Sequence, residues 1–92
     1  MIRTWANSAT RKFAETGKAK FPGLDRTRAD KLLALLDNAR SLKDIDPLKS
    51  VGLHKLKGAR KEQWAITVNG PWRICFGFHD GDAYEVEIVD YH

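Results

Sequence analysis

Residues 64–78 read Trp-Ala-Ile-Thr-Val-Asn-Gly-Pro-Trp-Arg-Ile-Cys-Phe-Gly-Phe, and the pattern of these residues is the clearest indication of the architecture. Large apolar residues recur at every second position over 64–68 and again over 72–78, which is the period of a strand with one buried face. The Asn69-Gly70 pair between the two runs is typical of a tight hairpin turn. We therefore expect an antiparallel hairpin. Its second strand should turn Trp72, Ile74, Phe76 and Phe78 to one face and Arg73, Cys75 and Gly77 to the other.

Two further strands are expected beside this hairpin. Leu53–Lys57 is a short strand closed by Gly58, and residues 79–82 form a second turn. The last strand should have Tyr84, Val86 and Ile88 on its inward face, before the sequence Asp90-Tyr91-His92. If this strand lies centrally in the sheet, its neighbours hold its C-terminal end in place.

The N-terminal third predicts a short edge strand and two helices. Ile2–Trp5 alternates as an edge strand does, and Asn7-Ser8 then caps a helix that Gly17 ends. A second helix begins after Asp25, and residues 41–46 add a turn that Pro47 stops. The buried stripe of the second helix is Ala29, Leu32, Leu33 and Leu36.

The element order β-α-α-β-β-β-β predicts an α+β fold, with two N-terminal helices packed on one face of a small, mostly antiparallel twisted sheet. The 92 residues suit a single domain spanning residues 1–92. Cys75 is the only cysteine, so neither an intrachain disulfide nor a Cys/His zinc finger is possible, and we expect it to be a half-buried strand residue. The sequence lacks both a membrane-length apolar run and an apolar signal core, so we expect a cytoplasmic protein without membrane contact.

Charge is distributed unevenly along the chain. The net charge is +4, with sixteen Lys and Arg against twelve Asp and Glu. Residues 1–60 carry fourteen of the basic residues and six of the acidic ones, so the acidic excess lies in the last third. A basic N-terminal two-thirds suits a polyanion such as nucleic acid, although a solvated basic surface has the same composition. Neither a phosphate-binding Gly-rich loop nor a G-x-S-x-G nucleophile elbow is present, which argues against an NTPase and an α/β-hydrolase.

Candidate catalytic residues fall in three places. His54 precedes Lys55 and Lys57, Arg73 lies on a strand between two large apolar residues, and the run Asp90-Tyr91-His92 follows the last strand. If these residues meet at one sheet edge, they supply imidazoles, a carboxylate, a phenol and a cation. RNA cleavage through the 2′-OH needs a general base, a general acid and a cation on the phosphate, and it needs no metal. A two-metal nuclease is disfavoured because Glu85 and Glu87 share one strand face and Asp90 lies on the other.

Four segments together carry a resemblance to a known family: residues 53–58 (LHKLKG), 64–68 (WAITV), 69–76 (NGPWRICF) and 87–92 (EIVDYH). They resemble the HigB branch of the RelE toxin superfamily, and the resemblance extends over essentially the whole chain. It implies a RelE-like fold and a bacterial toxin that enters the ribosomal A site and cuts the mRNA being translated. It also implies a HigA-like antitoxin partner whose helix-turn-helix domain binds the promoter DNA of the pair.

The resemblance also implies residue roles. His54 and His92 serve as general base and acid in an order that stays open, Arg73 holds the scissile phosphate, and Asp90 orients a histidine or joins the proton transfer. Tyr91 stacks on a base or donates a hydrogen bond. No cofactor or metal is expected. Contacts with mRNA and ribosomal RNA are assigned to five basic residues: Lys55, Lys57, Arg60, Arg26 and Lys31.

Two other hypotheses remain open at this stage. The RelE branch proper relies on Arg, Lys and Tyr, so its mechanism does not transfer to a site of histidines and an aspartate. The chain is then either an endonuclease, a non-catalytic RNA- or ribosome-binding module, or an inactive toxin that only binds its antitoxin. A DNA-binding repressor is disfavoured, because the leucine stripe of the second helix is needed for the core.

Overall fold

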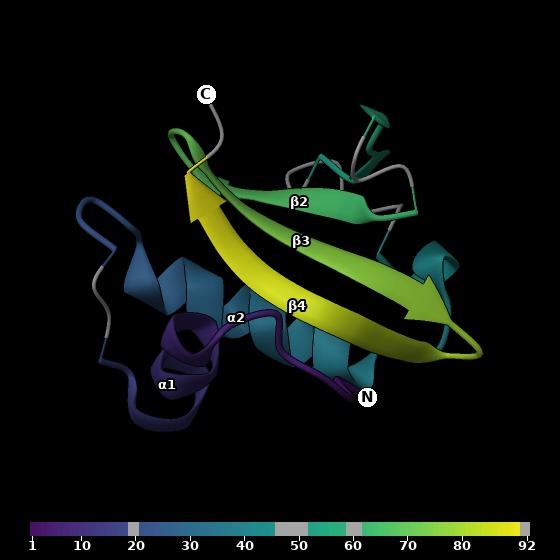
Figure 1. Cartoon of the computed structure of the whole chain (residues 1–92), viewed down its shortest axis with the longest axis horizontal. Coiled ribbons are helices and arrows are strands. Elements are labelled where there is room, and N and C mark those ends of the chain that lie inside the picture. The colour runs from purple at the N-terminus through teal and green to yellow at the C-terminus, as the bar shows by residue number, and fades with distance from the viewer. Residues whose placement is uncertain (19–20, 46–51, 59–61, 91–92) are drawn as a thin grey trace.

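The computed structural model describes residues 1–18, 21–45, 52–58 and 62–90 and confirms the α+β fold. Two helices come first, and four antiparallel strands follow in the order β1-β2-β3-β4. Both helices lie on one side of the sheet (Figure 1). The elements are α1 (Ser8–Thr16), α2 (Arg26–Asn38), the 3₁₀ turn η1 (Leu42–Asp44), β1 (His54–Lys55), β2 (Trp64–Asn69), β3 (Trp72–His79) and β4 (Asp82–Asp90).

Helix α1 begins and ends where the sequence predicts, and α2 begins after Asp25 as predicted. The side chain of Asn7, rather than that of Ser8, accepts a hydrogen bond from the N–H of Thr10 at 2.9 Å and caps α1. Gly17 ends α1 at φ +74° and donates its N–H to the carbonyl of Phe13. Asp25 caps α2 by accepting the N–H of Arg28 at 3.0 Å. Pro47, the predicted stop after η1, lies outside the described residues.

The alternation of the hairpin builds the main core between the sheet and the helices. Ile66, Ile74 and Phe76 are fully buried, and they face the apolar stripe of α2 and Phe13 of α1. The opposite face of the sheet has a second, smaller cluster, in which Leu56 covers Ala65 and Cys75. Cys75 is therefore fully buried rather than half-buried, because the segment around β1 folds over the middle of this face.

The condition that the last strand lies centrally in the sheet is not met. Within the described sheet β4 is the outermost strand and pairs with β3 alone among the named strands. The predicted N-terminal edge strand is reduced to two isolated parallel bridges, Ile2↔Ala83 and Trp5↔Val86, which cover the first half of β4. The meander order predicts which strands are neighbours, but it does not show which edge the N-terminal segment covers.

Tyr84 was predicted on the inward face and lies on the other one. The register shifts between Cys75↔Glu87 and Gly77↔Tyr84, which places one extra residue of β4 opposite β3. Glu85 takes φ +51° at this bulge, and the bulge reverses the alternation. Ala83 rather than Tyr84 is therefore buried in the main core.

Asp82 anchors the N-terminal segment at the start of β4. Its carboxylate lies 3.1 Å from Nε of Arg3 and 3.5 Å from the N-terminal ammonium. Burial works against ionisation of this carboxyl, but hydrogen bonds and charge from Arg3 and the ammonium outweigh it and lower the pKa of Asp82 below its ordinary 3.8.

We expect Leu36→Ala to lower the free energy of unfolding by about 2–5 kcal/mol, because Leu36 is fully buried between α2 and the sheet. Leu35→Ala is the matched control. Leu35 packs against the same core but is only partly buried, so its loss should lower the free energy of unfolding less. Urea denaturation measures both variants. Equal losses would contradict the assignment of the buried face of α2.

We expect Asp82→Asn to lower the melting temperature at pH 7 and to have no effect in strong acid. A carboxyl whose pKa is lower in the folded state stabilises the fold above pH 3.8, and this contribution is lost as pH falls through the lower folded value. Asp80→Asn is the control, because Asp80 is exposed and pairs with the preceding residue, His79. Thermal melts from pH 7 to pH 2 measure the difference, and a pH-independent loss in Asp82→Asn would refute this account.

Candidate functional site

Arg73 lies on the face of the sheet that the helices do not cover, as the alternation predicts. It pairs with Thr67 on β2 and with Val89 on β4, and all three residues belong to the face opposite α1 and α2, called here the open face. The Nη1 atom of Arg73 donates to the carbonyl of Gly70 at 2.7 Å and to that of Trp72 at 3.0 Å. Backbone carbonyls of the β2–β3 turn therefore hold the guanidinium while its positive charge is kept.

His54 lies on the same open face, two strands along from β3. It pairs with Ala65 on β2, and its Nδ1 lies 3.0 Å from the carbonyl oxygen of Gly52. A carbonyl oxygen can only accept a hydrogen bond, so Nδ1 carries the proton. In the neutral ring Nε2 then keeps its lone pair, which is the state that a general base requires.

Gly52 makes this arrangement possible, and the sequence analysis did not select it. Its backbone has φ +57°, and a Cβ atom added there would lie 3.2 Å from Oγ1 of Thr67. The chain thus approaches β2 closely just before β1 begins. A glycine two residues before His54 is visible in the sequence, but its contact with Thr67 depends on the fold.

The spacing of Arg73 and His54 follows from the strand register. Ala65 and Thr67 are two positions apart on β2 and point to the same face, and they pair with His54 and Arg73 respectively. Strand spacing and residue rise place the two Cα atoms about 12 Å apart. An extended nucleotide bound across β2 can contact a cation at one end and an imidazole at the other.

Asp90 ends β4 beside Arg73, but on the other face. It pairs with Trp72, one position before the Arg73↔Val89 pair, and alternation directs it to the helix side. His54 on β1 and Asp90 on β4 lie on opposite edges of the sheet, so the two do not share an edge. Tyr91 and His92, the other two predicted catalytic residues of the tail, lie outside the described residues.

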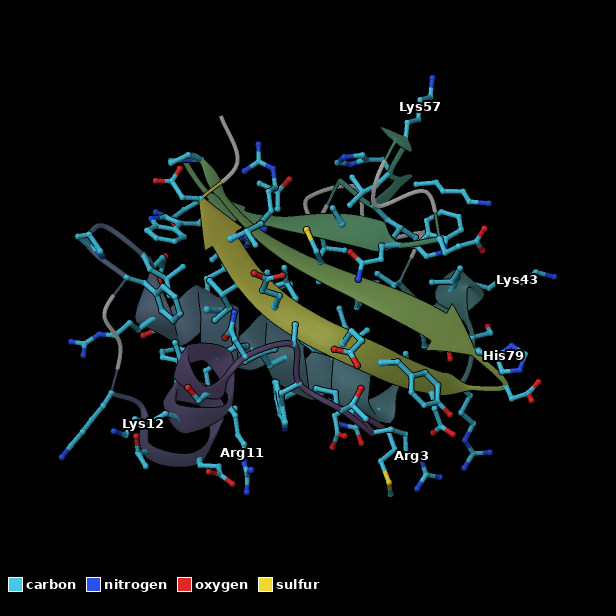
Figure 2. The ribbon with its side chains drawn as sticks, in the orientation of Figure 1. Arg3, Arg11, Lys12, Lys43, Lys57 and His79 are labelled. Carbon is cyan, nitrogen blue, oxygen red and sulfur yellow. The ribbon has the colours of Figure 1, made fainter. Side chains whose placement is uncertain are left out.

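The predicted RNA-contacting residues form two groups. Lys55 and Lys57 are exposed around β1, and Lys57 projects away from the sheet in Figure 2. The ammonium of Lys55 lies 6.0 Å from the ring centroid of Trp64, a cation–π contact. Arg26 and Lys31 are exposed on α2, in the other layer of the molecule. Arg60 lies outside the described residues.

The first turn of α2 is bound to the turn that holds Arg73. Asn69 accepts the N–H of Asp25 at 2.8 Å and donates its amide to the carbonyl of Gly23 at 2.9 Å. Nε of Arg28 donates to the carbonyl of Val68 at 2.7 Å. Arg26 therefore lies at the same end of the molecule as Arg73, and Arg28, which the sequence analysis did not select, belongs to that end too.

Neither metal-ion ligation nor a membrane span is supported by the described residues. In residues 1–18, 21–45, 52–58 and 62–90, no three His, Cys, Asp or Glu side chains gather in a group that can hold a metal ion. Neither α1 nor α2 is long and apolar enough to cross a membrane.

Two matches to known proteins extend over nearly the whole chain. Residues 4–92 match the family model described as the RelE-like toxin of the type II toxin–antitoxin system HigB. The chain is also 34% identical over 93 residues to the Endoribonuclease HigB of Proteus vulgaris, and the alignment covers 100% of both chains.

We expect Gly52→Ala to release the ring of His54. The new Cβ would press on Thr67 at an unfavourable φ, so the Gly52 carbonyl should move away and the proton should redistribute between the two ring nitrogens. Nitrogen-15 NMR of the imidazole above neutral pH reports which nitrogen carries the proton.

Gly17→Ala is the matched control for this experiment. Gly17 has φ +74° with nothing within 4 Å of an added Cβ, so the substitution strains the backbone without reaching His54. A His54 ring protonated mainly on Nε2 in the unsubstituted protein would overturn the assignment. An unchanged ring in Gly52→Ala would overturn the role of Gly52.

Proposed function

The chain belongs to the HigB-like family of RelE-like toxins, and from that premise we propose that it is a ribosome-dependent endoribonuclease that cuts mRNA in the A site during translation. Endoribonuclease activity agrees with the name of the full-length relative from Proteus vulgaris. The structural observation that carries the proposal is the open face, where a fixed cation at Arg73 and the imidazole of His54 lie on one side of the sheet.

Cleavage would proceed by acid–base attack of the 2′-OH. The base takes the 2′-OH proton, O2′ attacks phosphorus, and the bond to the leaving 5′-oxygen breaks while the acid protonates that oxygen. The products are a 2′,3′-cyclic phosphate and a 5′-hydroxyl, and the balance requires no metal or cofactor.

The residues divide these tasks. Nε2 of His54 is the proposed acceptor of the first proton, because Nδ1 is hydrogen-bonded to the carbonyl of Gly52. His92 is the proposed acid, and Asp90 orients it or joins the transfer. Arg73 stabilises the charge that develops on the phosphorane. Tyr91 stacks on a base or donates a hydrogen bond to the substrate.

Basic residues on both layers would bind RNA. Lys55, Lys57 and Arg60 would contact phosphates, together with Arg26 and Lys31 on α2. Such contacts supply salt-dependent affinity for mRNA and ribosomal RNA without reading sequence.

Family membership implies an antitoxin partner. We propose that this partner is HigA-like and that its helix-turn-helix domain supplies the contact with promoter DNA. The toxin would act in the cytoplasm, where translating ribosomes are found, as a single domain spanning residues 1–92.

We expect purified protein to cut mRNA in a translation reaction and to leave free RNA intact. His54→Ala and His92→Ala should each slow cutting by about 10²–10⁴-fold, because each removes a proton-transfer group. Mapping of new RNA 5′ ends, with and without ribosomes and without a C-terminal tag, measures the effect.

His79→Ala is the matched control for the histidine variants. His79 is exposed, pairs with Asp80 and lies at the far end of β3 from Arg73 (Figure 2), so its loss should leave cutting unchanged. Cutting of free RNA would make the protein a general ribonuclease. Ribosome binding without cutting would instead leave a binding module or an inactive toxin.

A further inference from the structure

Thr10 is a buried polar side chain that the proposed mechanism does not use. Among the described residues it is the one polar or charged residue that is fully buried, with an exposed fraction of 0%. Its Oγ1 accepts the backbone N–H of Ile88 at 3.0 Å, so α1 is hydrogen-bonded directly to β4 across 78 positions of sequence.

This hydrogen bond lies next along β4 after the last backbone hydrogen bonds between β4 and the N-terminal segment. The N–H of Val86 donates to the carbonyl of Thr4 at 3.1 Å, and the N–H of Ala6 donates to the carbonyl of Val86 at 3.0 Å. The chain then turns into α1, and the hydroxyl of Thr10 takes the next outward-facing amide of β4, that of Ile88.

Asn7 strengthens the same contact. Its Oδ1 accepts the N–H of Thr10 at 2.9 Å, and its Nδ2 donates to the carboxylate of Glu87 at 3.3 Å. The start of α1 therefore contacts two consecutive residues of β4. Asp90, the proposed catalytic carboxylate, follows Ile88 by two positions.

We propose that Thr10 is a positioning residue of the active site: by holding Ile88, it fixes the direction in which β4 presents Asp90. The inference rests on the proposed function, in which Asp90 takes part in cleavage. Without the hydroxyl, the backbone N–H of Ile88 loses the acceptor that links this end of β4 to α1. Displacement of a catalytic group by about 1 Å costs on the order of 10²-fold in rate.

Thr4 provides a matched control within the same edge. Its Oγ1 accepts the backbone N–H of Glu85 at 2.8 Å. Like Thr10, Thr4 therefore uses a side-chain hydroxyl to bind an amide of β4 that points away from β3. Glu85 lies at the bulge, three residues further from Asp90 than Ile88. Thr4→Val and Thr10→Val therefore remove the same kind of bond at two distances from the proposed site.

The experiment compares the full-length Thr10→Val, Thr10→Ser and Thr4→Val proteins for kcat and KM of mRNA cutting on translating ribosomes, with a melting temperature for each. We expect Thr10→Val to lower kcat by about 10–100-fold with KM within about threefold, because Thr10 does not touch substrate. Thr10→Ser keeps the acceptor oxygen and should restore kcat, and Thr4→Val should keep kcat near the original value.

Equal losses of kcat in the two valine variants at matched melting temperatures would show a purely structural role and overturn the proposal. Failure of Thr10→Ser to restore kcat would do the same. If Thr10→Val does not fold, Thr10→Cys replaces it, because sulfur is a weak acceptor in a side chain close in size to serine. The kcat of Thr10→Cys must then fall below that of Thr10→Ser.

Amide hydrogen exchange at Ile88 and Asp90 separates this proposal from the proposed function. We expect faster exchange at both amides in Thr10→Val than in Thr4→Val. If the unsubstituted protein does not cut mRNA, the proposed function fails, and exchange alone decides whether Thr10 holds the end of β4. Unchanged exchange in Thr10→Val would overturn the proposal whatever the activity.

Discussion

Pairing of β2 with β3 across the turn at Asn69 and Gly70 determines which residues face the helices and which face away. Because the register is regular from Trp64↔Phe76 to Thr67↔Arg73, burying Ile66, Ile74 and Phe76 against the helices forces Arg73 onto the open face. A shift of one residue would bury the guanidinium in the core, at a cost that no partner there offsets. The same register positions His54, since β1 pairs with Ala65 of β2.

Local patterns predicted the elements well, and contacts between distant segments were the part that they could not predict. Alternation over residues 64–78 identified the hairpin and the outward Arg73, and caps and apolar stripes identified both helices. The prediction assigned Tyr84 to the wrong face because one extra residue at Glu85 reverses the alternation of the strand. The ring of His54 is held by the carbonyl of Gly52, and the amide of Ile88 is held by the hydroxyl of Thr10. Both contacts depend on how the sheet folds, so the neighbouring residues in the sequence do not predict them.

The two layers of the molecule are joined by polar bonds at the end where Arg73 lies. Asn69 links the turn to Gly23 and to Asp25, the N-cap of α2. The indole of Trp72 also donates to the carbonyl of Pro22 at 3.2 Å. Phe21 packs edge-on against Trp72 as well, with ring centroids 5.5 Å apart. A guanidinium held by this turn is therefore supported by the helical layer as well as by the sheet, which would limit the entropy lost on binding the phosphate proposed as its ligand.

The hydrogen bonds between residues 1–6 and β4 join parts of the chain that are synthesised about eighty positions apart. Contacts of such long sequence separation slow folding, because the intervening loop must close before they contribute stability. They also cannot form until the ribosome has released residues 82–90. A nascent chain consequently lacks the outer edge of its sheet until β4 has emerged, and residues 1–6 have no strand to pair with while the residues between them are synthesised.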